Sequence, residues 1–215
     1  MGQVRTMVTS NSSRFRSLSA VAALLSLFTL SGCVSSLLTA PPPNTYELTG
    51  PADLKNVRGG SSAQILVPSP SALKILDSQR IAVTRGALVA YYPNAQYADT
   101  LPRVVQARII EAFEKTKQAR AVGRPGEGLS IDYQLLTDIR SFGYQAGATG
   151  SAGGTAVVEI SSRMMNDRTG RVVAFRVFRA EVPVLADDAP SVVAGLNVAL
   201  DQVLRELVTW SLGKT

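Results

Sequence analysis

The residue with the clearest covalent chemistry is Cys33, the only cysteine in the 215-residue chain. It ends the sequence Leu30-Ser31-Gly32-Cys33, directly after a short apolar run. A signal peptidase requires small side chains beside its cleavage site, and Ser31 and Gly32 provide them. The thiol of Cys33 is then available as the nucleophile for a thioether bond to a diacylglycerol. We therefore predict that Cys33 becomes the acylated first residue of the mature chain.

The segment before Cys33 has the pattern of a signal peptide. Residues 1–17 contain three arginines and no acidic residue, and an apolar run follows from Leu18 to Leu30. As a helix this run would be roughly 20 Å long, against a hydrocarbon core of about 30 Å. The leader resembles those of bacterial lipoproteins, so residues 1–32 are predicted to be removed. An uncleaved N-terminal anchor is the alternative.

Two features after Cys33 bear on where the protein is placed. Val34 stands where aspartate is the usual inner-membrane retention signal, which favours outer-membrane sorting. Residues 33–44 include Pro41-Pro42-Pro43, which favours extended geometry. The eleven residues between Cys33 and Thr45 could reach roughly 36 Å. We expect the lipidated cysteine and a proline-rich tether at 33–44, and one globular domain at 45–215.

The composition argues against an enzyme. The chain has no histidine, which removes the commonest general base and metal ligand. Without the leader's three arginines, 19 basic and 16 acidic residues remain, a net charge of +3 that is too small to indicate nucleic-acid binding. No Gly-x-x-x-x-Gly-Lys-Ser/Thr motif is present, so ATP would be handled by another subunit. We expect no catalytic residues, no metal and no cofactor.

One catalytic arrangement remains open on residue types alone, and a second is excluded by distance. A serine could pair with Lys55, Lys74 or Lys115, although nothing in the sequence pairs them. Asp132 and Asp138 share a strand face, but a separation of roughly 20 Å is too large for joint acid–base work.

Hydrophobic periodicity predicts an α+β fold in a single domain. A mostly antiparallel or mixed sheet of six or seven strands should carry two long amphipathic helices on one face. Ser71 could cap a single helical turn, and the glycine-rich run 143–154 is predicted to form a mobile hairpin tip rather than a phosphate cradle. Strands are expected at 45–48, 64–67, 80–85, 87–92, 129–140, 157–165 and 171–184, and helices at about 100–117 and 190–212.

Two groups of side chains are candidates for contact with a partner. Tyr91, Tyr92 and Tyr97 fall within seven residues and could form either part of the core or an exposed aromatic patch. Arg176 and Arg179 belong to an arginine-bearing hairpin, which could be a solvated face or a contact for lipid phosphates or an acidic partner.

The run Tyr91-Tyr92-Pro93-Asn94-Ala95-Gln96-Tyr97-Ala98-Asp99-Thr100-Leu101-Pro102, continuing through Arg103-Val104-Val105-Gln106, resembles the ABC-type transport auxiliary lipoprotein components. These lipoproteins work beside mammalian-cell-entry (MCE) domain proteins. The family usually has tryptophan where this chain has Tyr97. The resemblance implies a non-catalytic, outer-membrane-anchored periplasmic subunit of an intermembrane lipid transport system.

The partners that the resemblance implies are an MCE-domain protein and, through it, an ABC permease and ATPase. The membrane itself is a further partner, through the acyl chains on Cys33. A homo-oligomer is left open. Two other functions also remain open: a periplasmic carrier that binds lipid in its own cavity, and an envelope-integrity lipoprotein without a direct role in transport.

Overall fold

The computed structural model describes residues 2, 42–54, 57, 60–148 and 153–215. A compact unit spans Pro43–Thr215 and holds all of the helices and strands among these residues. Cys33 and the predicted signal peptide lie outside the described residues, so both stay predictions. None of the helices among the described residues is both long enough and apolar enough to span a membrane.

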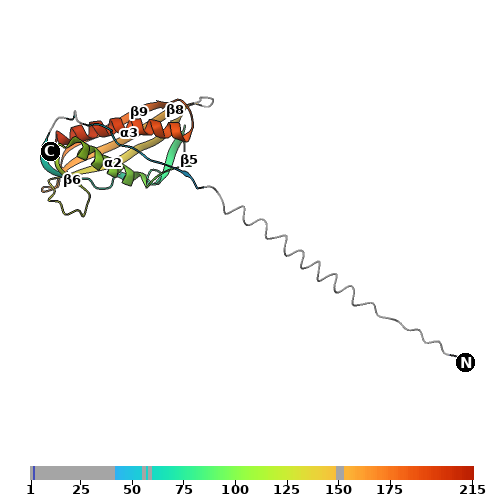
Figure 1. Cartoon of the computed structure of the whole chain (residues 1–215), viewed down its shortest axis with the longest axis horizontal. Coiled ribbons are helices and arrows are strands. Elements are labelled where there is room, and N and C mark those ends of the chain that lie inside the picture. Colours follow the sequence, from blue (N-terminus) through green and yellow to red (C-terminus); the bar gives the residue numbers. More distant parts are fainter. Residues whose placement is uncertain (1, 3–41, 55–56, 58–59, 149–152) are drawn as a thin grey trace. The chain divides into compact units, whose positions relative to one another are not determined.

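Nine strands form one mixed sheet, and two helices pack against it, which confirms the α+β class (Figure 1). The sheet has more strands than the six or seven expected. The helices are α2 (Leu101–Thr116) and α3 (Ala189–Leu212). The strands are β1 (Asn44–Tyr46), β2 (Ser61–Leu66), β3 (Ser71–Ala72), β4 (Arg80–Arg85), β5 (Leu88–Tyr97), β6 (Ala119–Gly123), β7 (Tyr133–Ala146), β8 (Gly154–Asn166) and β9 (Arg171–Val184).

The long strand β7 organises the sheet. One of its edges pairs antiparallel with β8 along the whole strand, and β8 pairs in turn with β9. Its other edge is shared, in parallel, by β2, β3 and β4. The alternation predicted for β7 is confirmed, since Leu135, Thr137 and Ile139 are buried on one face.

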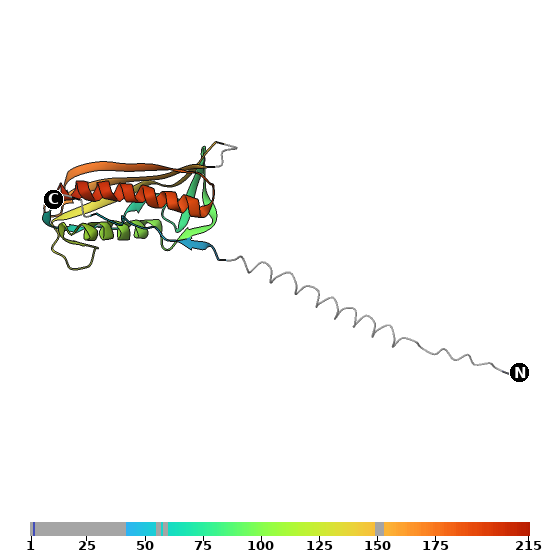
Figure 2. The ribbon, with the colours of Figure 1, turned by 45° about the horizontal axis from the view of Figure 1, so that its top comes forward.

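Both helices lie on the same face of the sheet, as expected (Figure 2). Helix α3 packs on β7, β8 and β9, and α2 packs beside α3. Asp188 is the N-cap of α3, and its side chain accepts a hydrogen bond from the backbone N–H of Ser191 at 2.8 Å. The apolar stripe of α3 is buried as predicted at Val193, Leu196, Leu200, Val203, Leu204 and Leu207.

The glycine-rich run contributes residues to two strands, which its composition does not suggest. Gly143 lies inside β7, opposite Ala82 of β4, and Gly154 begins β8. A Cβ atom on Gly143 would lie 2.4 Å from the carbonyl oxygen of Ala82. Glycine is therefore required here because two strands approach closely, and the prediction of a mobile tip over all of 143–154 is wrong.

Two further local expectations differ from the structure. Ser71 is not a helix cap: it lies in β3, and its hydroxyl donates to Asp138 Oδ1 at 2.8 Å. Strand β6 has no counterpart among the expected strands, because its sequence Ala-Arg-Ala-Val-Gly alternates weakly and its parallel pairing with β2 is a long-range contact. In contrast, the hairpin β4–β5 turns at Gly86, whose φ of 60° suits glycine.

Candidate functional site

The three candidate tyrosines divide between the core and the surface. Tyr97 is 1% exposed and packs edge-to-face on Phe142, with ring centroids 6.1 Å apart. Its hydroxyl has no hydrogen-bond partner among the described residues, and burial raises the pKa of Tyr97 strongly. Tyr97 is thus a core residue rather than a contact on the surface.

Tyr91 and Tyr92 are half-buried and lie on β5, close to its hairpin with β4. The guanidinium of Arg80 stands over the Tyr91 ring, 4.2 Å from its centroid. The Tyr92 hydroxyl donates to Asp187 Oδ1 at 3.1 Å. Burial, followed by this hydrogen bond, raises the pKa of Tyr92 to about 12. Each ring therefore has a partner within the domain and also an exposed part.

Asp187 lies between β9 and α3 and connects that segment to the two strands β4 and β5 at one end of the sheet. The carboxylate accepts from Arg85 Nη2 at 2.7 Å as well as from Tyr92. The hydrogen bond to Asp187 raises the pKa of Arg85, which stays charged in any case. The hydroxyl of Tyr144 is buried without a partner among the described residues, and desolvation followed by the charge of Asp187 raises the pKa of Tyr144. We call Arg85, Tyr92, Tyr144 and Asp187 the Asp187 cluster.

The Asp187 cluster stabilises the fold rather than supplying a reactive group. Its only carboxylate is neutralised by a guanidinium, and its phenols stay protonated at neutral pH. The cluster ties the segment between β9 and α3 to β4 and β5. Arg85 is 102 residues away from Asp187 in sequence, so their contact is apparent only in the folded structure.

The two candidate arginines form ion pairs with different acidic residues. Arg176 Nη2 lies 3.0 Å from Glu206 of α3, and the Arg176 guanidinium lies 5.0 Å from the Phe178 centroid. Arg179 lies 2.6 Å from Glu159 and 2.5 Å from Glu181, and these hydrogen bonds raise its pKa. Because both arginines are paired with carboxylates, their charge is compensated within the domain.

The carboxylates considered for catalysis also have structural partners. Asp132 Oδ2 accepts from the backbone N–H of Gln64 at 3.0 Å, and Asp138 Oδ1 accepts from the Ser71 hydroxyl. Lys115 Nζ lies 2.7 Å from Glu111 and donates to the Pro51 carbonyl at 2.9 Å. Among the described residues, no group of three or more acidic or cysteine side chains is arranged to hold a metal ion.

One surface groove lies between the chain after β1 and the first half of α2. Its volume is about 320 Å³, and its apolar part is formed by Leu48, Val104 and Ala107. Charged side chains stand at its rim, among them Glu47 and Arg108, whose charged groups are 3.7 Å apart. The sequence pattern does not reveal this groove, because β1 and α2 are far apart in sequence.

Comparison with known proteins identifies relatives for most of the folded unit. The sequence pattern of the ABC-type transport auxiliary lipoprotein components matches residues 46–208. Protein XCC0632 of Xanthomonas campestris, whose crystal structure is known and is assigned to the family DUF330, shares 30% identity and a TM-score of 0.74. That match covers 80% of this chain and 95% of XCC0632.

A curated relative is the uncharacterised protein bll6063 of Bradyrhizobium diazoefficiens, which is 31% identical over 169 residues. The match covers 78% of this chain but spans only 44% of that longer protein. A second solved structure, of an uncharacterised protein, has a TM-score of 0.53 at 12% identity and covers 80% of this chain and 95% of its own, so it supports the fold alone.

Proposed function

Because the chain belongs to the family of ABC-type transport auxiliary lipoprotein components, we propose that it is an outer-membrane-anchored accessory subunit of an MCE-type lipid transport system. One observation carries the proposal: the family match covers residues 46–208, almost all of the folded unit, directly downstream of the acylation sequence ending at Cys33. The proposed partners are an MCE-domain protein and, through it, an ABC permease and ATPase.

The contacts inside the domain support a non-catalytic role. Of the residues considered for catalysis, Asp132, Asp138, Lys74 and Lys115 are engaged in hydrogen bonds or ion pairs, and Lys55 lies outside the described residues. A general base needs a free lone pair within reach of its substrate, and a nucleophile needs such a base beside it. The domain would then contribute through binding and placement, and the ATPase would supply the energy.

The anchor at Cys33 gives the proposal its geometry. A tether that reaches roughly 36 Å keeps the domain near one membrane and raises its effective concentration for partners at that membrane. Val34 supports the outer membrane as that location.

Substitution of Cys33 by serine tests the anchor and its role together. Cys33→Ser should leave the domain folded but unacylated, either free in the periplasm or retained as precursor, and unable to support transport in a deletion strain. Val34→Ala is the matched control, since it keeps the thiol and should fractionate with the outer membrane. Full transport by Cys33→Ser would contradict the need for an anchor.

A lipid-binding carrier is a second candidate, and the groove beside Leu48, Val104 and Ala107 is the observation that favours it. Native mass spectrometry of the gently purified protein distinguishes the two functions. A carrier should retain a noncovalent lipid that is lost on Val104→Asp, whereas the accessory subunit should show only the mass of the acylated chain.

A further inference from the structure

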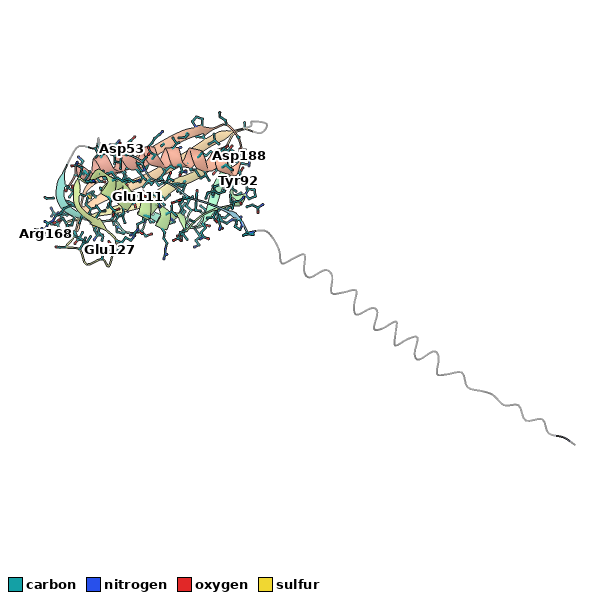
Figure 3. All side chains as sticks on the ribbon, in the orientation of Figure 1. Asp53, Tyr92, Glu111, Glu127, Arg168 and Asp188 are labelled. Atoms are coloured by element: carbon teal, nitrogen blue, oxygen red, sulfur yellow. The ribbon has the colours of Figure 1, made fainter. Side chains whose placement is uncertain are left out.

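Strand β9 presents the longest unpaired edge of the sheet among the described residues. It pairs with β8 alone, whereas the other strands that have a single neighbour, β1, β3 and β6, contain at most five residues each. The fourteen residues of β9 run from the turn that carries Arg168 to the segment that carries Asp188, at opposite ends of the folded unit (Figure 3). Such an edge offers a row of backbone N–H and C=O groups to another strand.

Only one end of this edge is irregular. Met164 of β8 lies opposite Ala174 and Met165 lies opposite Val172, so Val173 is an extra residue that disrupts the ladder locally. From Ala174 to Val184 the pairing with β8 is continuous over eleven residues. At about 3.3 Å per residue this part is roughly 36 Å long, which is enough for a second strand to pair along it. We call Ala174–Val184 the regular edge.

The side chains of the regular edge alternate between two faces of the sheet. Phe178 and Ala180 are buried, and Phe178 packs edge-to-face on Trp210 of α3, so the even-numbered side chains face the helices. The odd-numbered side chains face away from the helices. In order, these are Phe175, Val177, Arg179, Glu181 and Pro183, and Leu185 follows directly after the strand.

This order is self-complementary about Ala180. If two copies of β9 pair antiparallel with a two-fold axis at Ala180, Arg179 of each copy lies opposite Glu181 of the other. Val177 then lies opposite Pro183. Phe175 lies opposite Leu185, and these are two exposed apolar side chains, at 57% and 89%. Opposite charges and apolar side chains placed in this way stabilise a strand pair.

Neighbouring registers lack this complementarity. A pair centred one residue earlier places Arg179 opposite itself, and a pair centred one residue later places Glu181 opposite itself. Like charges directly opposite each other destabilise a strand pair. A pair centred on Val177 or Phe178 places Arg179 opposite an apolar side chain. The side chains therefore select the register centred on Ala180.

The ion pairs within the chain are compatible with this contact. Arg179 lies 2.6 Å from Glu159 and 2.5 Å from Glu181, so one guanidinium serves two carboxylates and the three groups carry a net charge of −1. The side chains of Arg179 and Glu181 are still 43% and 53% exposed. The guanidinium of a second copy would therefore reach a carboxylate that has only a shared partner.

We propose that two copies of this chain associate through their β9 strands, in an antiparallel pair centred on Ala180. The backbone hydrogen bonds supply affinity, and the side chains fix the register. The two-fold axis stands perpendicular to the sheet, so the sheet continues across both copies and the helices of both lie on one face. This inference goes beyond the proposed transport role and does not depend on it.

Charge reversal in two separate proteins tests the register. The full-length lipoprotein is purified in detergent, and native mass spectrometry measures its oligomeric state. Arg179→Glu places two acidic groups opposite each other at both contacts, and Glu181→Arg places two arginines there. Each variant alone should raise the dissociation constant of the dimer by at least about tenfold. An equal mixture of the two should restore the dimer, because positions 179 and 181 of the two proteins again carry opposite charges.

Two further sets of variants complete the experiment. Arg171→Glu makes the same change of charge on β9 outside the regular edge, and it should dimerise like the wild type. Phe175→Lys and Leu185→Glu replace exposed side chains, so the fold should not depend on them. Each should weaken the dimer alone, and their mixture should form more dimer than either, because position 175 of one protein faces position 185 of the other.

Three results would overturn the proposal, with circular dichroism used to confirm that each variant is folded. One is a wild-type protein that stays monomeric at every concentration tested. Another is a dimer that neither charge reversal weakens, which would place the contact elsewhere on the chain. The third is a pair of variants that weaken the dimer but whose mixture does not restore it. If the charge reversals at 179 and 181 prevent folding, the mixture of the variants at 175 and 185 decides.

Discussion

Replacement of Gly143 by alanine tests the close packing of β4 against β7. A Cβ atom at this position would lie 2.4 Å from the Ala82 carbonyl oxygen, whereas ordinary contacts of a Cβ atom begin at 3.4 Å. To restore an ordinary contact, the two strands would have to move apart by about 1.0 Å. A ladder hydrogen bond of about 2.9 Å would stretch to roughly 3.9 Å, which is beyond hydrogen-bonding range.

The expected cost follows from the length of that pairing. The strands β4 and β7 pair at three positions, Ala82–Thr84 with Gly143–Gln145. Loss of two or three hydrogen bonds at about 1 kcal/mol each gives about 2–3 kcal/mol, within the range known for overpacked sites. For a domain of this size the midpoint of thermal unfolding should fall by about 4–12 °C.

The assay is thermal and urea unfolding of the full-length protein in detergent, followed by circular dichroism. Gly50→Ala is the matched control, because its nearest neighbours are 3.7 Å from the added Cβ atom. That variant should stay within about 0.5 kcal/mol of the wild type. If Gly143→Ala is equally stable, the segment is not packed as a strand, and the reasoning from close approach fails.

Three further predictions concern single side chains. Tyr97→Phe should leave the free energy of unfolding unchanged or raise it, because it removes a buried hydroxyl without a partner among the described residues. Tyr97→Ala should lower the free energy of unfolding by about 3–5 kcal/mol, because it empties a buried site. Calorimetry measures both changes. The pKa of the Tyr92 phenol should be about 12 in the folded protein and about 10 in the unfolded chain. The contribution of Tyr92 to the free energy of unfolding is therefore complete below pH 10 and is lost as the pH rises from 10 to 12. Ultraviolet absorbance of the phenolate follows this ionisation, and Asp187→Asn should shift it only part of the way toward 10, because burial is the larger cause. Asp188→Ala removes the N-cap of α3 and should cost about 1 kcal/mol in urea unfolding; a cost near zero would show that the cap is dispensable.

Periodic elements could be predicted from the sequence because their signals are local. The alternation around Leu135 and Ile139 marked β7, and the helical spacing of Leu196, Leu200 and Leu207 marked α3. Both extend over enough residues for one buried face to be recognised. The class of the fold followed, since two such helices need a sheet to cover.

Features that depend on long-range approach could not be predicted in the same way. Gly143 looked like part of a flexible run, although its lack of a side chain is what allows β4 to approach. Tyr97 resembled its neighbours Tyr91 and Tyr92 in type, and only the tertiary packing on Phe142 separates them. The pairing of Arg176 and Arg179 with acidic residues likewise could not be read from the arginines themselves.

Quantitative crosslinking in intact envelopes tests the central claim most directly. A photoreactive amino acid on the folded domain of the wild-type lipoprotein should crosslink repeatedly to an MCE-domain protein identified by mass spectrometry. The same probe in Cys33→Ser should lose most of that product, because the domain is no longer held at the membrane. Crosslinks confined to peptidoglycan or to outer-membrane insertion factors, with no MCE-domain partner, would contradict the account.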